Sequence, residues 1–347
     1  MKFTKFAAIA CGALLAGPLS AQVNLTAETA SPGGAVYLSP AHLTEVAGTK
    51  GIANIQLTDG QTLTNSIQNV AEGKTDIAGT PYILPFLMSR GVGPYGSLGK
   101  EAGAELASNL RAITPVTLGV FFLFAYDAKN VGGWDDIEGR KIYNGPPRGG
   151  ALTNARTMIQ IITGLKDGEG YEGMQANWGQ ASSIIASGEP DAVVLPELFP
   201  GSRLSTVAAA GKMTGWSMPK DVYESEAMQK YMVAPGSAPM TMPIAELSET
   251  MGEDWTFVSE DDTFRAFATV GGNVVNKSMD EQLVYDLVSA YIDTMDALKA
   301  KAPFGNNVAF DEPMQGMCGA NPIKYHKGAA RAWEDAGYAL EDCAKDM

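Results

Sequence analysis

The sequence has few of the residues and motifs that enzymes use for nucleophilic, metal or phosphate chemistry. Its 347 residues include two histidines, His42 and His326, which lie far apart along the chain. No G-x-S-x-G, H-E-x-x-H or Walker motif occurs. The segment Gly91–Gly96 fits G-x-G-x-x-G, but no clear strand precedes it and its proline favours a loop. We therefore expect neither enzymatic activity nor a bound cofactor.

Long apolar runs are also scarce. At the start of the chain, Lys2 and Lys5 form a basic region, Phe6–Leu15 an apolar run, and Leu19–Ala21 a small-residue cleavage site. The apolar run is too short to span a membrane, and nothing later approaches the roughly 20 residues that a span needs. Residues 1–21 are therefore predicted to be a cleaved signal peptide. This prediction places a soluble protein, without membrane insertion, in a bacterial periplasm.

The sequence has few positively charged residues relative to its acidic residues. The chain has 25 Lys and Arg residues against 39 Asp and Glu residues, and its formal net charge is −14. Because residues 1–21 contain two lysines and no acid, their removal takes this charge from −14 to −16. Such an acidic surface argues against nucleic acid or an anionic membrane as a partner. It leaves anionic small molecules open as ligands, because a pocket can differ in sign from the surface around it.

Only three cysteines occur, and Cys11 lies in the predicted signal peptide. The other two, Cys318 and Cys343, form an even pair in an oxidising compartment, which predicts a disulfide. The alternative is a metal site built on both thiols. That site would need further ligands, and His326 is the only histidine nearby. We therefore predict the disulfide and no metal.

The rest of the chain has the composition of a globular protein, with 45% apolar and 18% charged residues and length for about two domains. Short apolar runs typical of strands alternate with helical patterns, which favours parallel α/β sheets. We expect two lobes, with the chain crossing between them near 117–127 and again near 264–275. Lobe 1 would comprise residues 22–126 and 264–347, and lobe 2 residues 127–263. Strands are expected at 23–29, 52–57, 76–79, 117–126, 141–144, 191–195 and 264–275, and helices at 63–71, 152–165, 182–187, 281–300 and 327–337.

A Gly/Pro turn at Gly145–Gly150 is the most informative segment of the sequence. It follows the predicted strand Lys141–Asn144 and precedes a helix. The start of a helix offers free N–H groups and positive dipole charge, and glycines let an anion approach the backbone. Arg148 adds a forked donor that suits a carboxylate. An ordinary strand-to-helix turn, with Arg148 paired to an acid at the surface, is the alternative. The ligand-binding candidates here are Pro147, Arg148, Gly149 and Gly150.

Further candidates lie at other predicted ends of strands and starts of helices. Ser31, Gly33 and Gly34 belong to a second Gly-rich turn, which alternatively closes the chain tightly without a ligand. Tyr37 is a candidate for ligand contact or for the core, and Thr80 and Pro81 follow a predicted strand end. Glu197 is a candidate acceptor for a ligand ammonium, or a partner of Arg148 or Arg203. In contrast, Asp76 and Asp191 are read as structural caps, and His326 as part of a helix start.

Five segments, in order along the chain, carry a resemblance to a known family. They are Pro32–Tyr37; Ser66–Val70 with Gly73 and Asp76; Glu138–Ile142 with Gly145 and Pro146; Ser187–Ala192 with Pro200; and Pro322–Gly337 with His326, Gly328, Ala329 and Glu334. Their order and spacing resemble the TAXI class of extracytoplasmic solute receptors, which serve tripartite ATP-independent periplasmic (TRAP) transporters. Where that family usually has a Gly-Ser-Gly-Thr-like turn, this chain has Arg148–Ala151.

The resemblance implies a two-lobed periplasmic binding protein fold of type II with the ligand between the lobes. It also implies capture of a small carboxylate or amino-acid-like anion, such as glutamate, and delivery to the membrane subunits of a TRAP permease. Two alternatives stay open at this point. One is a receptor that presents its ligand to a membrane sensor kinase, and the other is a periplasmic enzyme on the same fold.

Overall fold

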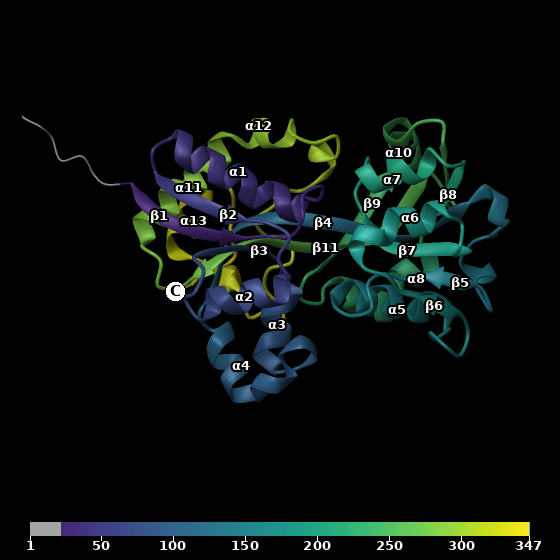
Figure 1. The fold of residues 1–347 in the computed structure, drawn as a ribbon, viewed down its shortest axis with the longest axis horizontal. Coiled ribbons are helices and arrows are strands. Elements are labelled where there is room, and N and C mark those ends of the chain that lie inside the picture. Colours follow the sequence, from purple (N-terminus) through teal and green to yellow (C-terminus); the bar gives the residue numbers. More distant parts are fainter. Residues whose placement is uncertain (1–21, 347) are drawn as a thin grey trace, which may run out of the picture.

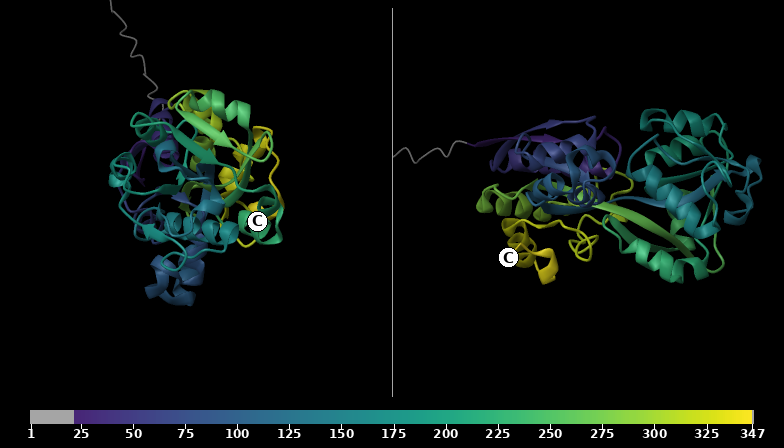
Figure 2. Two further views of the ribbon diagram at one scale, coloured as in Figure 1. Left: turned by 90° about the vertical axis from the view of Figure 1, so that its right-hand side faces the viewer. Right: turned by 90° about the horizontal axis from the view of Figure 1, so that it is seen from below.

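The computed structural model describes residues 22–346 and shows an α/β protein with two lobes side by side (Figure 1). Two long strands, β4 (Leu110–Tyr126) and β11 (Thr263–Asn276), run antiparallel to each other through both lobes. Figure 2 shows the same lobes from below, with the C-terminal segment beside the first lobe. The predicted two-lobed fold with crossover strands is confirmed. The predicted signal peptide, residues 1–21, lies outside the described residues.

The first lobe has the sheet order β2-β1-β3-β11-β4. Its strands β1, β2 and β3 are parallel, and helices join them, as the alternating sequence pattern predicts. β11 runs antiparallel to β3 and so brings the C-terminal part of the chain into this lobe. The elements are β1 (Val23–Glu28), α1 (Ala35–Thr49), β2 (Ala53–Thr58), α2 (Leu63–Ala71), β3 (Ile77–Pro81), α3 (Ile83–Arg90), α4 (Gly99–Ala107), α11 (Glu281–Asp293), α12 (Met295–Lys299), β12 (Lys324–Tyr325) and α13 (Lys327–Asp335).

The second lobe continues the sheet in the order β4-β7-β5-β6. β8 pairs with β4 and β10, and β9 pairs with β11. Across residues 22–346, no helix has both the length and the apolar character needed to cross a membrane. The elements are β5 (Lys141–Tyr143), α5 (Gly150–Thr163), β6 (Glu172–Met174), α6 (Ala181–Ala186), β7 (Ala192–Glu197), α7 (Ser202–Ala208), β8 (Met213–Trp216), α8 (Lys220–Glu224), α9 (Glu226–Met232), β9 (Ser237–Pro243), α10 (Ile244–Met251) and β10 (Trp255–Val258).

Each lobe has apolar cores of its own. On β4, buried side chains up to Val116 pack in the first-lobe core, and those from Val120 onward pack in the second-lobe cores. On β11 the same change falls between Ala268 and Val270. Leu198 is an exception, because it follows β7 in the second lobe but packs in the first-lobe core. The exact lobe boundaries given above stay a prediction.

Two elements differ most from their predicted limits, and in both a polar residue bonds to a residue far away in the sequence. The helix predicted over 281–300 divides into α11 and α12 at Thr294, whose hydroxyl donates a hydrogen bond to the carbonyl of Ala290 and also contacts His42. β4 begins at Leu110, before the apolar run of the sequence, because Thr114 is buried and bonded to the amide of Asn273. Polar residues satisfied inside a core interrupt an apolar pattern without ending the strand.

Three residues that the sequence predicts to be structural, rather than ligand-binding, make structural hydrogen bonds. The Asp76 carboxylate accepts hydrogen bonds from the backbone N–H and the hydroxyl of Thr26, and the Asp191 carboxylate accepts one from the N–H of Lys141. His326 is the N-cap of α13, and its ring accepts from the N–H of Gly328. The predicted caps and the predicted helix start are therefore confirmed.

The G-x-G-x-x-G segment does not form a nucleotide-binding turn. A helix, α3, precedes it, and Gly91 ends that helix with a φ of 61°. The following residues Gly93–Leu98 form a 3-10 helix. The strand, turn and helix that such a motif needs are not found at this segment.

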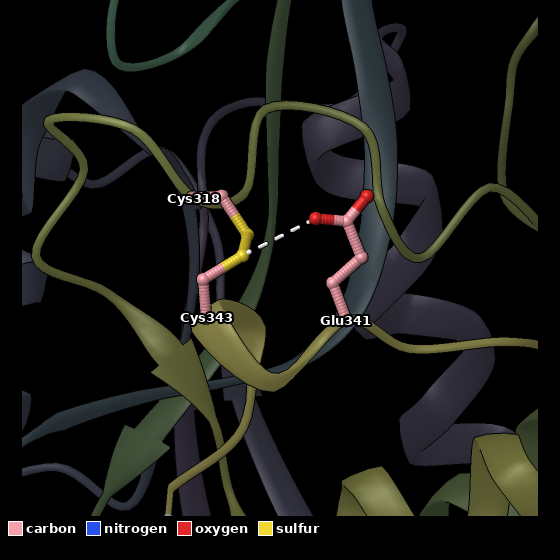
Figure 3. Close-up of side chains that lie close together, drawn as sticks. All are labelled: Cys318, Glu341 and Cys343. Atoms are coloured by element: carbon pink, nitrogen blue, oxygen red, sulfur yellow. Dashed lines mark hydrogen bonds between the residues drawn. A yellow bond between two sulfur atoms is a disulfide. The ribbon is translucent and has the colours of Figure 1, made fainter.

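Cys318 and Cys343 form a disulfide with a Cα–Cα distance of 5.4 Å (Figure 3). Their sulfurs also lie near the carboxylate of Glu341, a grouping with metal-ligand chemistry. Bonded to each other, however, the sulfurs are not thiolates, which are the form that ligates a metal. The predicted disulfide is confirmed, in preference to the alternative two-cysteine metal site.

Replacing Cys318 and Cys343 together by serine is expected to lower the free energy of unfolding by about 3 kcal/mol. The bond closes a loop with a sequence separation of 25 and so restricts the unfolded chain. Urea unfolding of both proteins measures the difference. Two thiols that react with an alkylating agent in the denatured wild type would contradict the pairing.

His42 is expected to make stability depend on pH. Its ring is 2% exposed in α1, with Nδ1 2.8 Å from the Lys301 ammonium and Nε2 2.9 Å from the Thr294 hydroxyl. Burial, together with the charge of Lys301, lowers the pKa of His42 to about 4. Between that pKa and its usual value near 6.5, the unfolded chain binds a proton that the folded protein does not.

Stability should therefore fall by up to about 3 kcal/mol as the pH drops from 6.5 toward 4, and be fully present above that window. Urea unfolding of wild type and His42→Gln across this range isolates the contribution of His42. An unchanged difference between the two proteins at all pH values would contradict it.

Candidate functional site

The Gly145–Gly150 turn forms the strand-to-helix connection that the sequence predicts. It joins β5 to α5, and its glycines Gly145 and Gly149 have φ values of 113° and 105°, in the region that favours glycine. Gly149 is the N-cap of α5, and no side chain caps the helix. Free N–H groups are therefore available to an anion at this end of the helix.

Arg148 lies at the rim of this turn rather than in a buried position. Pro147, Arg148 and Gly149 are exposed, and Gly150 is partly exposed. Among residues 22–346, no ion pair or hydrogen bond of the Arg148 side chain is described. All donors of the guanidinium are therefore available. The alternative, a surface arginine paired to an acid, would need an acidic partner, and none is described there.

The second Gly-rich turn starts α1 in the first lobe and faces the second lobe. Gly34 is the N-cap of α1, again without a side-chain cap, and Gly33 has a φ of 111°. A β-carbon placed on Gly33 would lie 3.9 Å from the Ser202 hydroxyl, at the start of α7. Ser31 is exposed, and Tyr37 is partly buried in the first turn of α1. The starts of α1 and α7 therefore approach each other across the two lobes.

The end of β3 approaches the start of α5 in the same way. A β-carbon on Gly150 would lie 3.6 Å from a methyl group of Ile83, the first residue of α3. Thr80 and Pro81 end β3 just before it. Thr80 is fully buried, and its hydroxyl has no hydrogen-bond partner in the described structure. Buried polar groups seldom lack a hydrogen-bond partner, so the Thr80 hydroxyl remains a candidate for ligand contact.

Glu197 lies at the carboxyl end of β7 and is 3% exposed. Of the partners considered for it, the structure shows Arg203, whose Nε donates to Glu197 Oε1 at 2.5 Å. Burial raises the pKa of the Glu197 carboxyl, and the charge and hydrogen bond of Arg203 act in the opposite direction. The guanidinium of Arg203 also lies over the ring of Trp178, 4.9 Å from its centre. The carboxylate is therefore part of a three-residue cluster.

Trp178 and Arg203 were not among the site residues predicted from the sequence. The segment that carries Trp178 is bonded to the Gly145–Gly150 turn two residues earlier, where the N–H of Ala176 donates to Gly145 O and the Tyr143 hydroxyl donates to Ala176 O. Trp178 begins a 3-10 helix of three residues, Trp178–Gln180, and a single aromatic residue in so short an element carries little sequence signal. The best available signal was Glu197 itself, since a buried acid requires a nearby cation.

A separate pocket of about 300 Å³ lies between the end of α9 and the segment 312–317. Its walls include Met232, Met314, Met317 and Pro239, and none of the predicted site residues lines it. Ser237, Gln315 and Glu312 also line it, and the Glu312 carboxylate would repel an anion there. We therefore place the candidate site at the facing helix starts, where N–H groups are free and where Arg148 precedes α5 and Arg203 lies in the first turn of α7.

Comparison with known proteins finds a matching family and several distantly similar structures. The model of the NMT1-like family matches residues 28–337. No curated protein matches the chain. Among solved structures, the chain is similar to the periplasmic aliphatic sulphonate binding protein SsuA from Escherichia coli, with 9% identity, coverage of 80% of this chain and 77% of that one, and a TM-score of 0.41.

Two receptors for other solutes are similar over a larger share of both chains. One is DctP7, a Bordetella pertussis extracytoplasmic solute receptor binding pyroglutamic acid, with 10% identity, 90% and 93% coverage and a TM-score of 0.41. The other is the periplasmic ectoine-binding protein of the TeaABC TRAP transporter of Halomonas elongata, with 11% identity, 90% coverage of both chains and a TM-score of 0.43. The family match spans most of the chain, and the protein therefore belongs to the NMT1-like family.

Proposed function

We propose that the protein is a periplasmic solute-binding protein that captures a small anionic organic solute between its lobes. The observation that carries this proposal is the pair of helix starts capped by glycine, Gly34 in one lobe and Gly149 in the other. Each presents N–H groups and the positive end of a helix dipole, which favour a carboxylate. Closure of two lobes on a ligand is an established mode of binding.

The finer parts of the proposal follow from the resemblance to TAXI receptors. The solute is a carboxylate or amino-acid-like anion, and the protein delivers it to the membrane subunits of a TRAP permease. Ser31, Gly33, Gly34 and Tyr37 would contact it from the first turn, and Thr80 and Pro81 from the end of β3. Pro147, Arg148, Gly149, Gly150 and Glu197 would contribute from the second lobe.

Mass spectrometry of the small molecule released from the denatured, natively purified protein tests the class of solute. We expect a carboxylate, and adding it back to ligand-free protein should reduce the radius of gyration in small-angle scattering. A co-purified cation or uncharged sugar would overturn the anionic class. Tight binding without compaction would remove lobe closure from the proposal.

Arg148→Ala is expected to weaken binding of that carboxylate by about 10- to 150-fold. A charge-assisted hydrogen bond contributes about 1.5–3 kcal/mol, and Arg148 has its donors free at the start of α5. Arg148→Lys should recover only part of the affinity, because a point charge cannot make two parallel hydrogen bonds. Calorimetric titration measures all three proteins. Equal affinities would assign the anion to backbone N–H groups alone.

A further inference from the structure

Glu197, Arg203 and Trp178 form a cluster whose construction exceeds what the fold requires. A buried ion pair gives little net stability, because both charges lose their hydration. Glu197 nevertheless places its carboxylate at the carboxyl end of β7, where open α/β sheets bind their ligands. Arg203 follows at the start of α7, next to Ser202, which approaches Gly33 of the other lobe. The cluster therefore faces the contact between the lobes.

Two contacts hold the guanidinium of Arg203 in place, and some of its N–H donors remain available. Its Nε is bonded to Glu197, and its plane lies over the Trp178 ring. Within residues 22–346, no protein partner is described for its two terminal nitrogens, and the side chain is 22% exposed. These nitrogens form a fixed fork that is suited to a flat acceptor group.

Trp178 provides a flat surface beside this fork. The residue is 43% exposed although the guanidinium lies over its ring. The hydrogen bond of Ala176, two residues earlier, to Gly145 joins the segment of Trp178 to the Gly145–Gly150 turn, which ends at the start of α5. A ligand whose carboxylate lies at that helix start can therefore place the rest of its body against Trp178.

The charge of the cluster limits what that body can be. Glu197 and Arg203 together are neutral, so the fork attracts a hydrogen-bond acceptor but not a second full negative charge. A second carboxylate would also meet the negative charge of Glu197 nearby. A neutral flat acceptor, such as a lactam, an amide or a ring nitrogen, has no such penalty.

We infer that Arg203, held by Glu197 and Trp178, determines specificity, and that the site takes a monocarboxylate with a flat polar body in preference to a dicarboxylate. This inference rests on the proposed function of the interlobe site. It names Arg203 as the residue that recognises the body of the ligand, while the helix start of α5 and Arg148 bind its carboxylate.

Calorimetry of the ligand-free mature protein tests the inference with two matched pairs of probes. Pyroglutamate and glutarate share five carbons, and nicotinate and phthalate share a flat ring. We expect the monocarboxylate of at least one pair to bind at least tenfold more tightly than its dicarboxylate. Arg203→Lys, which keeps a cation for Glu197, should weaken that monocarboxylate at least tenfold. The matched variant Arg148→Lys should weaken both members of the pair alike.

Glu197→Gln distinguishes a role in specificity from a role in structure. The amide can still accept from Arg203 but no longer neutralises it, so the preference should shift at least tenfold toward the dicarboxylate. An unchanged preference, or an Arg203→Lys variant with wild-type affinities, would overturn the inference and leave the proposed function standing. If none of the four probes binds the wild type, this inference falls, while the proposed carboxylate class is still decided by the co-purified solute.

Discussion

Gly272→Ala is expected to lower the free energy of unfolding by about 4 kcal/mol, near the upper end of what single substitutions cost. Gly272 lies in β11, opposite Pro115 of β4. A β-carbon there would meet the carbonyl oxygen of Thr114 in β4, and the Tyr82 hydroxyl would also be in the way. Because the first obstacle is backbone, relief requires the two strands to separate, and the ladder that joins the lobes would be disturbed.

Urea unfolding of Gly272→Ala measures this loss, and Gly48→Ala is the matched control. Gly48 lies in α1, and a β-carbon there would have no neighbour within 4 Å. The control should gain about 0.5–1 kcal/mol, since glycine weakens a helix relative to alanine. A wild-type midpoint for Gly272→Ala would mean that the crossover strands tolerate a wider spacing than the structure shows.

Arg203→Ala is expected to lower the free energy of unfolding by about 3–5 kcal/mol at pH 8. The variant leaves the Glu197 carboxylate buried at the end of β7 without its cation, and an unpaired buried charge is costly. Replacing both residues, as Glu197→Leu with Arg203→Met, should restore much of the loss because neither charge remains.

The loss should be smaller at pH 5 than at pH 8. Burial already raises the pKa of the Glu197 carboxyl in the wild type, and without Arg203 the pKa rises further. The folded variant then binds a proton that the unfolded chain releases, so its stability falls as the pH rises through that range. Urea unfolding at the two pH values measures the change. Equal losses at both would show that Glu197 remains ionised by other means.

The sequence predicted the elements whose signals are local. The helix over Leu63–Ala71 has its exact predicted limits, and the Gly145–Gly150 turn starts a helix as its glycines and prolines indicate. The buried run at Thr117–Tyr126 predicted a crossover strand because both of its faces are apolar. In each case, neighbouring residues alone determine the structure.

Features that depend on distant residues were not predictable in the same way. The helix divides at Thr294, whose hydroxyl is hydrogen-bonded to His42, a residue far earlier in the chain. Glu197 had several possible partners in the sequence. Arg203 is its partner because the chain turns after β7 and brings Arg203 back to the Glu197 carboxylate. Trp178 joins that cluster through the Arg203 guanidinium over its ring, and hydrogen bonds of Ala176 tie its segment to Tyr143 and Gly145. Periodicity contains no information about such pairings.

Leu198 links the two lobes in a way that affects how fast a solute is captured. It follows β7 but packs in the first-lobe core, and Asn307 Nδ2 donates to the carbonyl of its neighbour Phe199 at 2.6 Å. Separating the lobes exposes this leucine, at a cost of about 2 kcal/mol. This cost opposes opening, and a solute can enter only the open form, so the observed association rate follows the open fraction. A smaller residue at position 198 would increase the open fraction and speed association.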